Sequence, residues 1–119
     1  MSLDGVRVLL VEDEAIIAMT AEDMLEELGC TLAATAASVD EAFACVEAKA
    51  FDVALLDINL NGEQSLPVAA VLRERGTPFI FTTGYGAAGL SAEYVDAPLV
   101  TKPYQLIDLE RALRQALGR

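Results

Sequence analysis

Short apolar segments that end on acidic residues alternate along this chain with longer segments of helical periodicity. The first apolar segment, residues 6–11, is rich in β-branched side chains, and three acidic residues follow it directly. Another, residues 52–57, ends on an aspartate. Nearly continuous apolar runs of this length are typical of strands that are covered on both faces, as in parallel sheets. The alternation therefore predicts an α/β protein.

Residues 15–28 carry apolar side chains at spacings of three and four, and Gly29 follows them as a C-terminal stop. Ser38 and Glu41 have the spacing of a capping box, so the next helix is expected over residues 39–49. The other expected elements are a weak strand at 30–37, a helix at 66–75, strands at 78–82 and 99–101, and a helix at 104–117.

This order of elements predicts a doubly wound, five-stranded parallel sheet with helices on both faces, because right-handed crossovers place each helix over the sheet. A length of 119 residues suits one core, and no linker interrupts the pattern, so we expect residues 1–119 to form a single domain. Three glycines between Gly84 and Ala97 make any helix there short and easily frayed.

The composition excludes several functions. A formal net charge of -11 repels phosphate backbones and anionic lipids, so neither direct nucleic-acid binding nor membrane binding is expected. The chain has no histidine, which removes Ser-His-Asp catalysis, and Cys30 and Cys45 lack a CxxC spacing and are expected to be small buried hydrophobes. Without a signal peptide or a long apolar run, the sequence suits the reducing cytoplasm.

Acidic residues follow two of the predicted strands: Glu12 and Asp13 the first, and Asp57 the third. The carboxyl ends of parallel strands share one edge of a sheet, so these residues should converge. Carboxylates within roughly 4 Å repel by about 4 kcal/mol per pair at an effective dielectric of about 20, which favours a bound cation such as Mg²⁺. The alternative is that Asp13 caps a helix and Asp57 caps a turn.

Two further strand ends carry groups that suit a phosphoryl ligand. Thr83 contributes a hydroxyl at the end of the fourth strand, and Lys102 contributes an ammonium at the end of the fifth. Lys102 is one of only two lysines, and it directly follows an apolar strand. A cation at this position can pair with Asp57 before a reaction and with a phosphoryl oxygen after it.

Together these residues resemble the motifs of the response-regulator receiver family over essentially the whole chain. The motifs are, in order, an acidic pair, an aspartate, a threonine or serine and a Lys-Pro, present here as Glu12-Asp13, Asp57, Thr83 and Lys102-Pro103. The resemblance implies the flavodoxin-like receiver fold, with its five strands in the order 2-1-3-4-5.

The resemblance also implies a role for each site residue. Asp57 would accept a phosphoryl group from a histidine kinase or a histidine phosphotransfer protein. Mg²⁺ would be bound by Asp13, Asp57 and the backbone carbonyl of Asn59, with Glu12 acting through a metal-bound water. Such a protein is not a conventional enzyme, but it catalyses its own aspartyl phosphorylation and dephosphorylation. It would then signal to a downstream protein target or an output domain.

Residues 78–85 resemble the Pro-Phe-x-Phe-Ala-Thr-Gly-Tyr signature of the subclass called FAT GUY, with Thr82 in place of the alanine. Leu99 stands three positions before the lysine, where most receivers carry an aromatic residue that reorients on phosphorylation. Residues 58–62 lack the proline that is common in the family. Because residues 84–97 have few apolar anchors, we expect this segment to be the bistable element that phosphorylation orders.

The sequence leaves three alternatives to this function. A degenerate receiver would keep the fold without phosphorylation, but the site residues are all present. A metal-dependent phosphatase with an aspartyl nucleophile needs a second aspartate two positions on, where this chain has Asn59. A flavin-binding protein would need a phosphate-cradling loop after the first strand, where acidic residues would repel the flavin phosphate.

Overall fold

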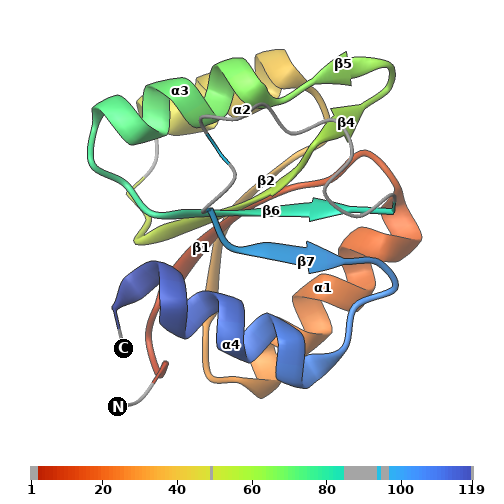
Figure 1. Ribbon diagram of the computed structural model, residues 1–119, viewed down its shortest axis with the longest axis vertical. Coiled ribbons are helices and arrows are strands. Elements are labelled where there is room, and N and C mark those ends of the chain that lie inside the picture. The colour runs from red at the N-terminus through yellow and green to blue at the C-terminus, as the bar shows by residue number, and fades with distance from the viewer. Residues whose placement is uncertain (1–2, 49, 85–93, 95–96, 119) are drawn as a thin grey trace.

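The computed structural model describes residues 3–48, 50–84, 94 and 97–118. A five-stranded sheet runs through its centre in the order β2-β1-β3-β6-β7 (Figure 1). All neighbouring strands in this sheet are parallel. The strands are β1 (Arg7–Val11), β2 (Thr31–Ala36), β3 (Val53–Asp57), β6 (Phe79–Thr83) and β7 (Leu99–Thr101). The predicted α/β sheet and its order 2-1-3-4-5 are confirmed, with β6 and β7 as the fourth and fifth strands.

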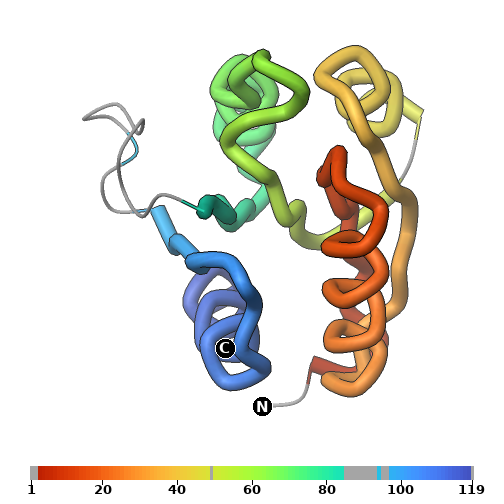
Figure 2. Tube along the Cα trace, turned by 90° about the vertical axis from the view of Figure 1, so that its right-hand side faces the viewer, coloured from red at the N-terminus to blue at the C-terminus, as the bar shows by residue number. Residues whose placement is uncertain are grey.

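Within the described part of the chain, four helices cover the two faces of the sheet. They are α1 (Ala15–Glu27), α2 (Val39–Ala48), α3 (Leu66–Glu74) and α4 (Leu106–Leu117). Helices α2 and α3 lie on one face, and α1 and α4 lie on the other (Figures 1 and 2). Among the described residues, none of the helices has the length and apolar character needed to cross a bilayer.

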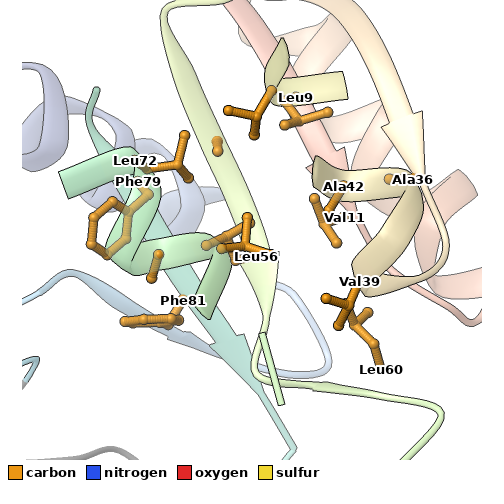
Figure 3. Close-up of a cluster of buried hydrophobic side chains, with 14 of the residues drawn as sticks. Leu9, Val11, Ala36, Val39, Ala42, Leu56, Leu60, Leu72, Phe79 and Phe81 are labelled. Carbon is orange, nitrogen blue, oxygen red and sulfur yellow. The ribbon is translucent and has the colours of Figure 1, made fainter. Parts of the chain in front are cut away.

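The two faces of the sheet form separate hydrophobic layers because alternate residues of each strand point to opposite sides. Figure 3 shows the layer under α2 and α3, where Leu56 of β3, Leu72 of α3 and Phe81 of β6 are fully buried. On the other face, Leu55 and Ile80 pack with residues of α1 and α4. The central strand β3 is buried along its whole length, as its continuous apolar sequence predicts.

The capping box predicted before α2 is present. The amide of Glu41 donates to the Ser38 Oγ at 3.1 Å, and the Glu41 carboxylate accepts from the amide of Ala37 at 2.8 Å. The Glu41 carboxylate thus accepts from the amide of Ala37, whereas a capping box usually satisfies the amide of the N-cap residue, here Ser38. Both contacts fix the start of α2 directly after β2.

The segment after β3 contains a structure that the sequence analysis did not anticipate. Residues 59–64 form an antiparallel hairpin of β4 (Asn59–Leu60) and β5 (Glu63–Gln64). The turn between them is Asn61-Gly62, with φ of 50° and 85°. Such left-handed conformations suit asparagine and glycine in a tight hairpin turn. Leu60 is buried in the α2 and α3 layer and anchors the hairpin to the core.

Several predicted positions differ from the structure. The last helix begins at Leu106 rather than at residue 104, because Tyr104 is buried in the core beneath it. Ile107 was expected on the apolar side of that helix, but it is 53% exposed. Cys30 is buried as expected, whereas Cys45 is only half-buried. The predicted short helix between residues 84 and 97 falls on residues that lie outside the described structure, apart from Gly84, Tyr94 and Ala97.

Candidate functional site

The three acidic residues singled out from the sequence lie together at the carboxyl edge of the sheet. Glu12 and Asp13 directly follow β1, and Asp57 is the last residue of β3. One carboxylate oxygen from each lies within 4.8 Å of the other two. Glu12 and Asp57 are buried and Asp13 is half-buried. The pairing of β1 with β3 brings these strand ends side by side.

Lys102 lies between two of these carboxylates. It follows β7, and its Nζ is 2.9 Å from Asp57 Oδ2 and 3.0 Å from Glu12 Oε1. Its side chain is only 11% exposed. Burial alone would lower the pKa of Lys102, but the hydrogen bonds and charges of Asp57 and Glu12 outweigh burial and raise this pKa above its usual value. Lys102 therefore remains protonated and supplies a positive charge to the pocket.

The Glu12 carboxylate is held on both of its oxygen atoms. Its Oε1 accepts from Lys102, and its Oε2 accepts from the amide of Glu14 at 3.2 Å. Burial raises the pKa of Glu12 to about 7, although the contact with Lys102 acts in the opposite direction. A second cation beside this carboxylate would favour its ionised form.

The hairpin of β4 and β5 contributes two backbone amides to the acidic cluster. The amide of Asn61 donates to Asp13 Oδ2 at 3.0 Å, and the amide of Asn59 donates to Asp57 Oδ1 at 3.4 Å. The alternative in which Asp13 caps the first helix is wrong, because α1 has Glu14 at its N-cap position and no side-chain cap. Asp57 does accept from the turn that follows its strand.

Thr83 ends β6 and is buried beside the same pocket edge. Its carbonyl oxygen accepts from the amide of Lys102 at 2.8 Å. This hydrogen bond extends the pairing of β6 with β7 by one step beyond the strands. A backbone hydrogen bond thus joins the ends of these two strands at the pocket.

The donor set of the pocket fits a small, hard divalent cation. It consists of carboxylate oxygens from Glu12, Asp13 and Asp57, and Mg²⁺ is bound by oxygen ligands and retains several waters. The carboxylates carry more negative charge than Lys102 neutralises, so a divalent cation would relieve their repulsion. Asn59, the remaining predicted ligand, lies two residues after Asp57 in β4.

Two residues of the site were not predicted from the sequence. One is Asn61, although the pair Asn61-Gly62 is itself a hairpin signal. The other is Tyr104, whose Oη lies 3.5 Å from Glu12 Oε1. Tyr104 follows the Lys-Pro motif after a cis peptide bond between Lys102 and Pro103, and no periodicity in the sequence indicates where its side chain points.

Comparisons with known proteins identify the family of this chain. A family model described as the response regulator receiver domain matches residues 8–114. SdrG from Sphingomonas melonis Fr1 is 41% identical, with a TM-score of 0.86 and 100% of both chains covered. A structure of SdrG in its BeF3-activated conformation is 38% identical, with a TM-score of 0.82 and 98% of both chains covered.

The PhyR receiver domain from Erythrobacter litoralis is 31% identical, with a TM-score of 0.85 over 97% of this chain and 92% of that one. The transcriptional regulatory protein TcrA of Mycobacterium tuberculosis is 36% identical over 98% of this chain and 47% of its own length. The transcriptional regulatory protein PdtaR of the same organism is 28% identical over 95% of this chain and 57% of the length of PdtaR. The chain thus spans about half the length of these curated relatives. It belongs to the response regulator receiver domain family and is a receiver of two-component signal transduction.

Proposed function

We propose that Asp57 accepts a phosphoryl group from a phosphohistidine of a histidine kinase or a histidine phosphotransfer protein. The observation that carries this proposal is the bridge from Lys102 to both Asp57 and Glu12 within a cluster of three carboxylates. A buried lysine beside a nucleophilic carboxylate is placed to stabilise charge on an incoming phosphoryl group. We further propose that residues 1–119 form one receiver domain that works in the cytoplasm.

The metal in this proposal is Mg²⁺. Asp13, Asp57 and the backbone carbonyl of Asn59 would bind it directly, and Glu12 would act through a bound water. When bound, the ion neutralises charge on the transferring phosphoryl oxygens. The amide of Asn61 keeps the Asp13 carboxylate in place, and the amide of Asn59 does the same for Asp57.

Phosphoryl transfer requires a positioned nucleophile and positive charge around the phosphoryl oxygens. An Asp57 oxygen bonds to phosphorus while the bond from phosphorus to the donor imidazole nitrogen breaks, and the electron pair remains on that nitrogen. Lys102 moves its contact from Asp57 to a phosphoryl oxygen. In the reverse half of the cycle, a water oxygen bonds to phosphorus, the acyl phosphate bond breaks, and inorganic phosphate leaves. The protein is thus its own catalyst rather than a conventional enzyme.

The response is read out at the ends of β6 and β7. A phosphoryl group adds about -1.5 to -2 charges and three strong acceptors beside Thr83 and Lys102. Because the Lys102 amide is bonded to the Thr83 carbonyl, the two strand ends move together. We propose that this movement changes the surface presented to a downstream protein target or an output domain.

Intact mass after incubation with acetyl phosphate and Mg²⁺ tests the assignment of Asp57. The wild type should gain one phosphate, and Asp57→Asn should gain none. Asp23→Asn is the matched control, because Asp23 is an exposed aspartate on α1, and it should be modified like the wild type. An adduct on both the wild type and Asp57→Asn, or on neither, contradicts the proposal. No adduct on a folded wild type would instead favour a degenerate receiver.

Beryllofluoride tests the proposed readout, since a BeF3-activated conformation has been described for SdrG. Hydrogen exchange at the amides of residues 79–83 and 99–102 should slow when beryllofluoride and Mg²⁺ are added. The expected change requires Asp57 and is absent from Asp57→Asn. Identical exchange in the wild type with and without beryllofluoride rules out this part of the proposal.

A further inference from the structure

Two buried hydroxyl groups lie beneath the acidic pocket and have no part in the proposed phosphoryl transfer. Thr82 of β6 is 1% exposed and Tyr104 is 6% exposed. Thr82 is also the residue that departs from the alanine of the FAT GUY signature. Tyr104 belongs to the α1 and α4 layer, and the strand alternation puts Thr82 on that same face, since Ile80 belongs to it and Phe81 to the other.

The phenol of Tyr104 reaches Glu12 from beneath. Its Oη is 3.5 Å from Glu12 Oε1, the oxygen that also accepts from Lys102 at 3.0 Å. Glu12 Oε2 accepts from the amide of Glu14. Lys102 must be free to follow a phosphoryl group, whereas Tyr104 is fixed by its burial. Tyr104 is thus a donor that can hold Glu12 when Lys102 moves away.

Thr82 lies on the same face of the sheet as this phenol. Its Oγ1 is buried and makes no hydrogen bond of good geometry with another described residue. It is nonetheless close enough to oppose the effect of burial, which raises the pKa of Tyr104 to about 12. A tyrosine phenol is an O–H donor at neutral pH, and the Tyr104 hydroxyl donates to the Glu12 carboxylate rather than to Thr82.

We propose that Tyr104 is a positioning residue that directs the Glu12 carboxylate toward the acidic cluster, with Thr82 supporting the phenol. The inference rests on the proposed function, in which Glu12 acts at the Mg²⁺ site. Among the described residues, Tyr104 is joined to the carboxylate cluster by its hydrogen bond to Glu12. Removal of the Tyr104 hydroxyl should therefore weaken Mg²⁺ binding and leave the fold intact.

Isothermal titration of Mg²⁺ into the wild type, Tyr104→Phe, Thr82→Val and the double variant tests this inference. Tyr104→Phe keeps the ring and should weaken Mg²⁺ binding roughly three- to tenfold, as expected for losing one hydrogen bond of ordinary strength. Thr82→Val should weaken binding by less than about twofold, because Thr82 acts only through the phenol. In the Tyr104→Phe background, Thr82→Val should have no effect, and this non-additivity identifies the pair as one unit.

A second readout needs no metal. The side-chain carboxyl resonance of Glu12 in the ¹³C spectrum of the metal-free protein should shift in Tyr104→Phe. Tyr94→Phe removes a phenol hydroxyl elsewhere in the core and should change neither this resonance nor Mg²⁺ affinity. An unchanged Glu12 resonance together with wild-type Mg²⁺ affinity in Tyr104→Phe overturns the inference while leaving the proposed function intact. Failure of the wild type to bind Mg²⁺ would overturn both.

Discussion

At the scale of single residues, Lys102 determines the charge balance of the pocket. Its ammonium contacts Asp57 and Glu12, so the chain already places a cation where the carboxylates would otherwise repel. Breaking a buried ion pair by removing one partner leaves an uncompensated charge, which is costly in a low dielectric. Mg²⁺ and Lys102 therefore act on the same carboxylates, and each reduces the attraction that the other experiences.

We predict that Lys102→Gln binds Mg²⁺ about tenfold more tightly than the wild type, because the pocket loses a positive charge that repels the ion. The same variant should be phosphorylated more slowly by acetyl phosphate, since the lysine no longer stabilises charge on the phosphoryl oxygens. Isothermal titration and intact mass measure the two effects. Arg111→Gln removes an exposed cation from α4 and should change neither. Weaker Mg²⁺ binding by Lys102→Gln would contradict this charge argument.

The sequence predicted some residues of the site and not others for a physical reason. Glu12 and Lys102 directly follow apolar strands and Asp57 ends one, so the convergence of parallel strand ends was enough to bring them together. Tyr104 lies in a connection without regular structure, and the direction of its side chain depends on the packing beneath α4. Strand periodicity carries no information about such a position.

The hairpin of β4 and β5 is the element on which the geometry of Asp13 depends. Its turn residue Asn61 donates to that carboxylate, and Leu60 anchors it in the core. The sequence analysis noted only that a proline was missing from this loop. The Asn61-Gly62 turn supplies backbone order instead, through a conformation that a proline cannot adopt.

Gly62→Ala tests the link between the hairpin and the metal site. Gly62 has φ of 85° with open space around it, so the alanine adds backbone strain of about 1 kcal/mol without a clash. We expect this loss of stability together with a several-fold loss of Mg²⁺ affinity, measured by urea unfolding and titration. Gly76→Ala is the matched control, with φ of 71° and equally open space at the end of α3. Gly76→Ala should lose stability but keep its Mg²⁺ affinity. Equal Mg²⁺ affinities in the wild type and both variants would show that the hairpin does not affect the metal site.

Tyr94 is held in an aromatic cluster with two residues of β6. Tyr94 is 3% exposed and packs edge-on against Phe79 and Phe81 of β6, with ring centroids 6.1 and 5.5 Å away. The guanidinium of Arg73 lies 4.6 Å from the centre of the Tyr94 ring. Tyr94 is thus one apolar anchor in this part of the chain, and the ordering of residues 84–97 by phosphorylation stays a prediction, because most of these residues lie outside the described structure. The burial of Tyr94 could not be predicted, because the sequence around it has neither helix nor strand periodicity.

We predict that Tyr94→Leu lowers the free energy of unfolding by about 1 to 3 kcal/mol, because it removes the ring contacts with β6 and the Arg73 interaction. Tyr94→Phe retains the ring and should stay within about 0.5 kcal/mol of the wild type. Urea unfolding compares the three proteins. A loss in Tyr94→Phe as large as that in Tyr94→Leu would show that the hydroxyl, rather than the ring, carries the stability.

At the scale of the whole molecule, the order of strands was predictable because five apolar segments, the crossovers between them and a family resemblance all indicate the same sheet. The sequence indicated less about the surface. Ile16 and Met19 contribute to the helical periodicity of α1, yet they are 80% and 62% exposed. Periodicity places side chains on a helix face, but the position of the neighbouring elements decides how much of that face is covered.

The net charge of -11 implies two separable effects of added salt. Dissolved ions screen the repulsion among all the acidic residues, over a length of about 10 Å at 0.1 M, so NaCl should raise the unfolding temperature in general. Binding of Mg²⁺ at the carboxylate cluster adds a specific term by mass action, about 2.7 kcal/mol at a concentration of about 100 times Kd. At matched ionic strength, MgCl₂ should therefore stabilise the wild type more than NaCl does.

Asp13→Asn should keep the response to NaCl and lose most of the additional stabilisation by Mg²⁺, whereas Asp23→Asn should keep both. A full Mg²⁺ increment in Asp13→Asn would show that the ion stabilises the molecule through its general field rather than at the acidic cluster.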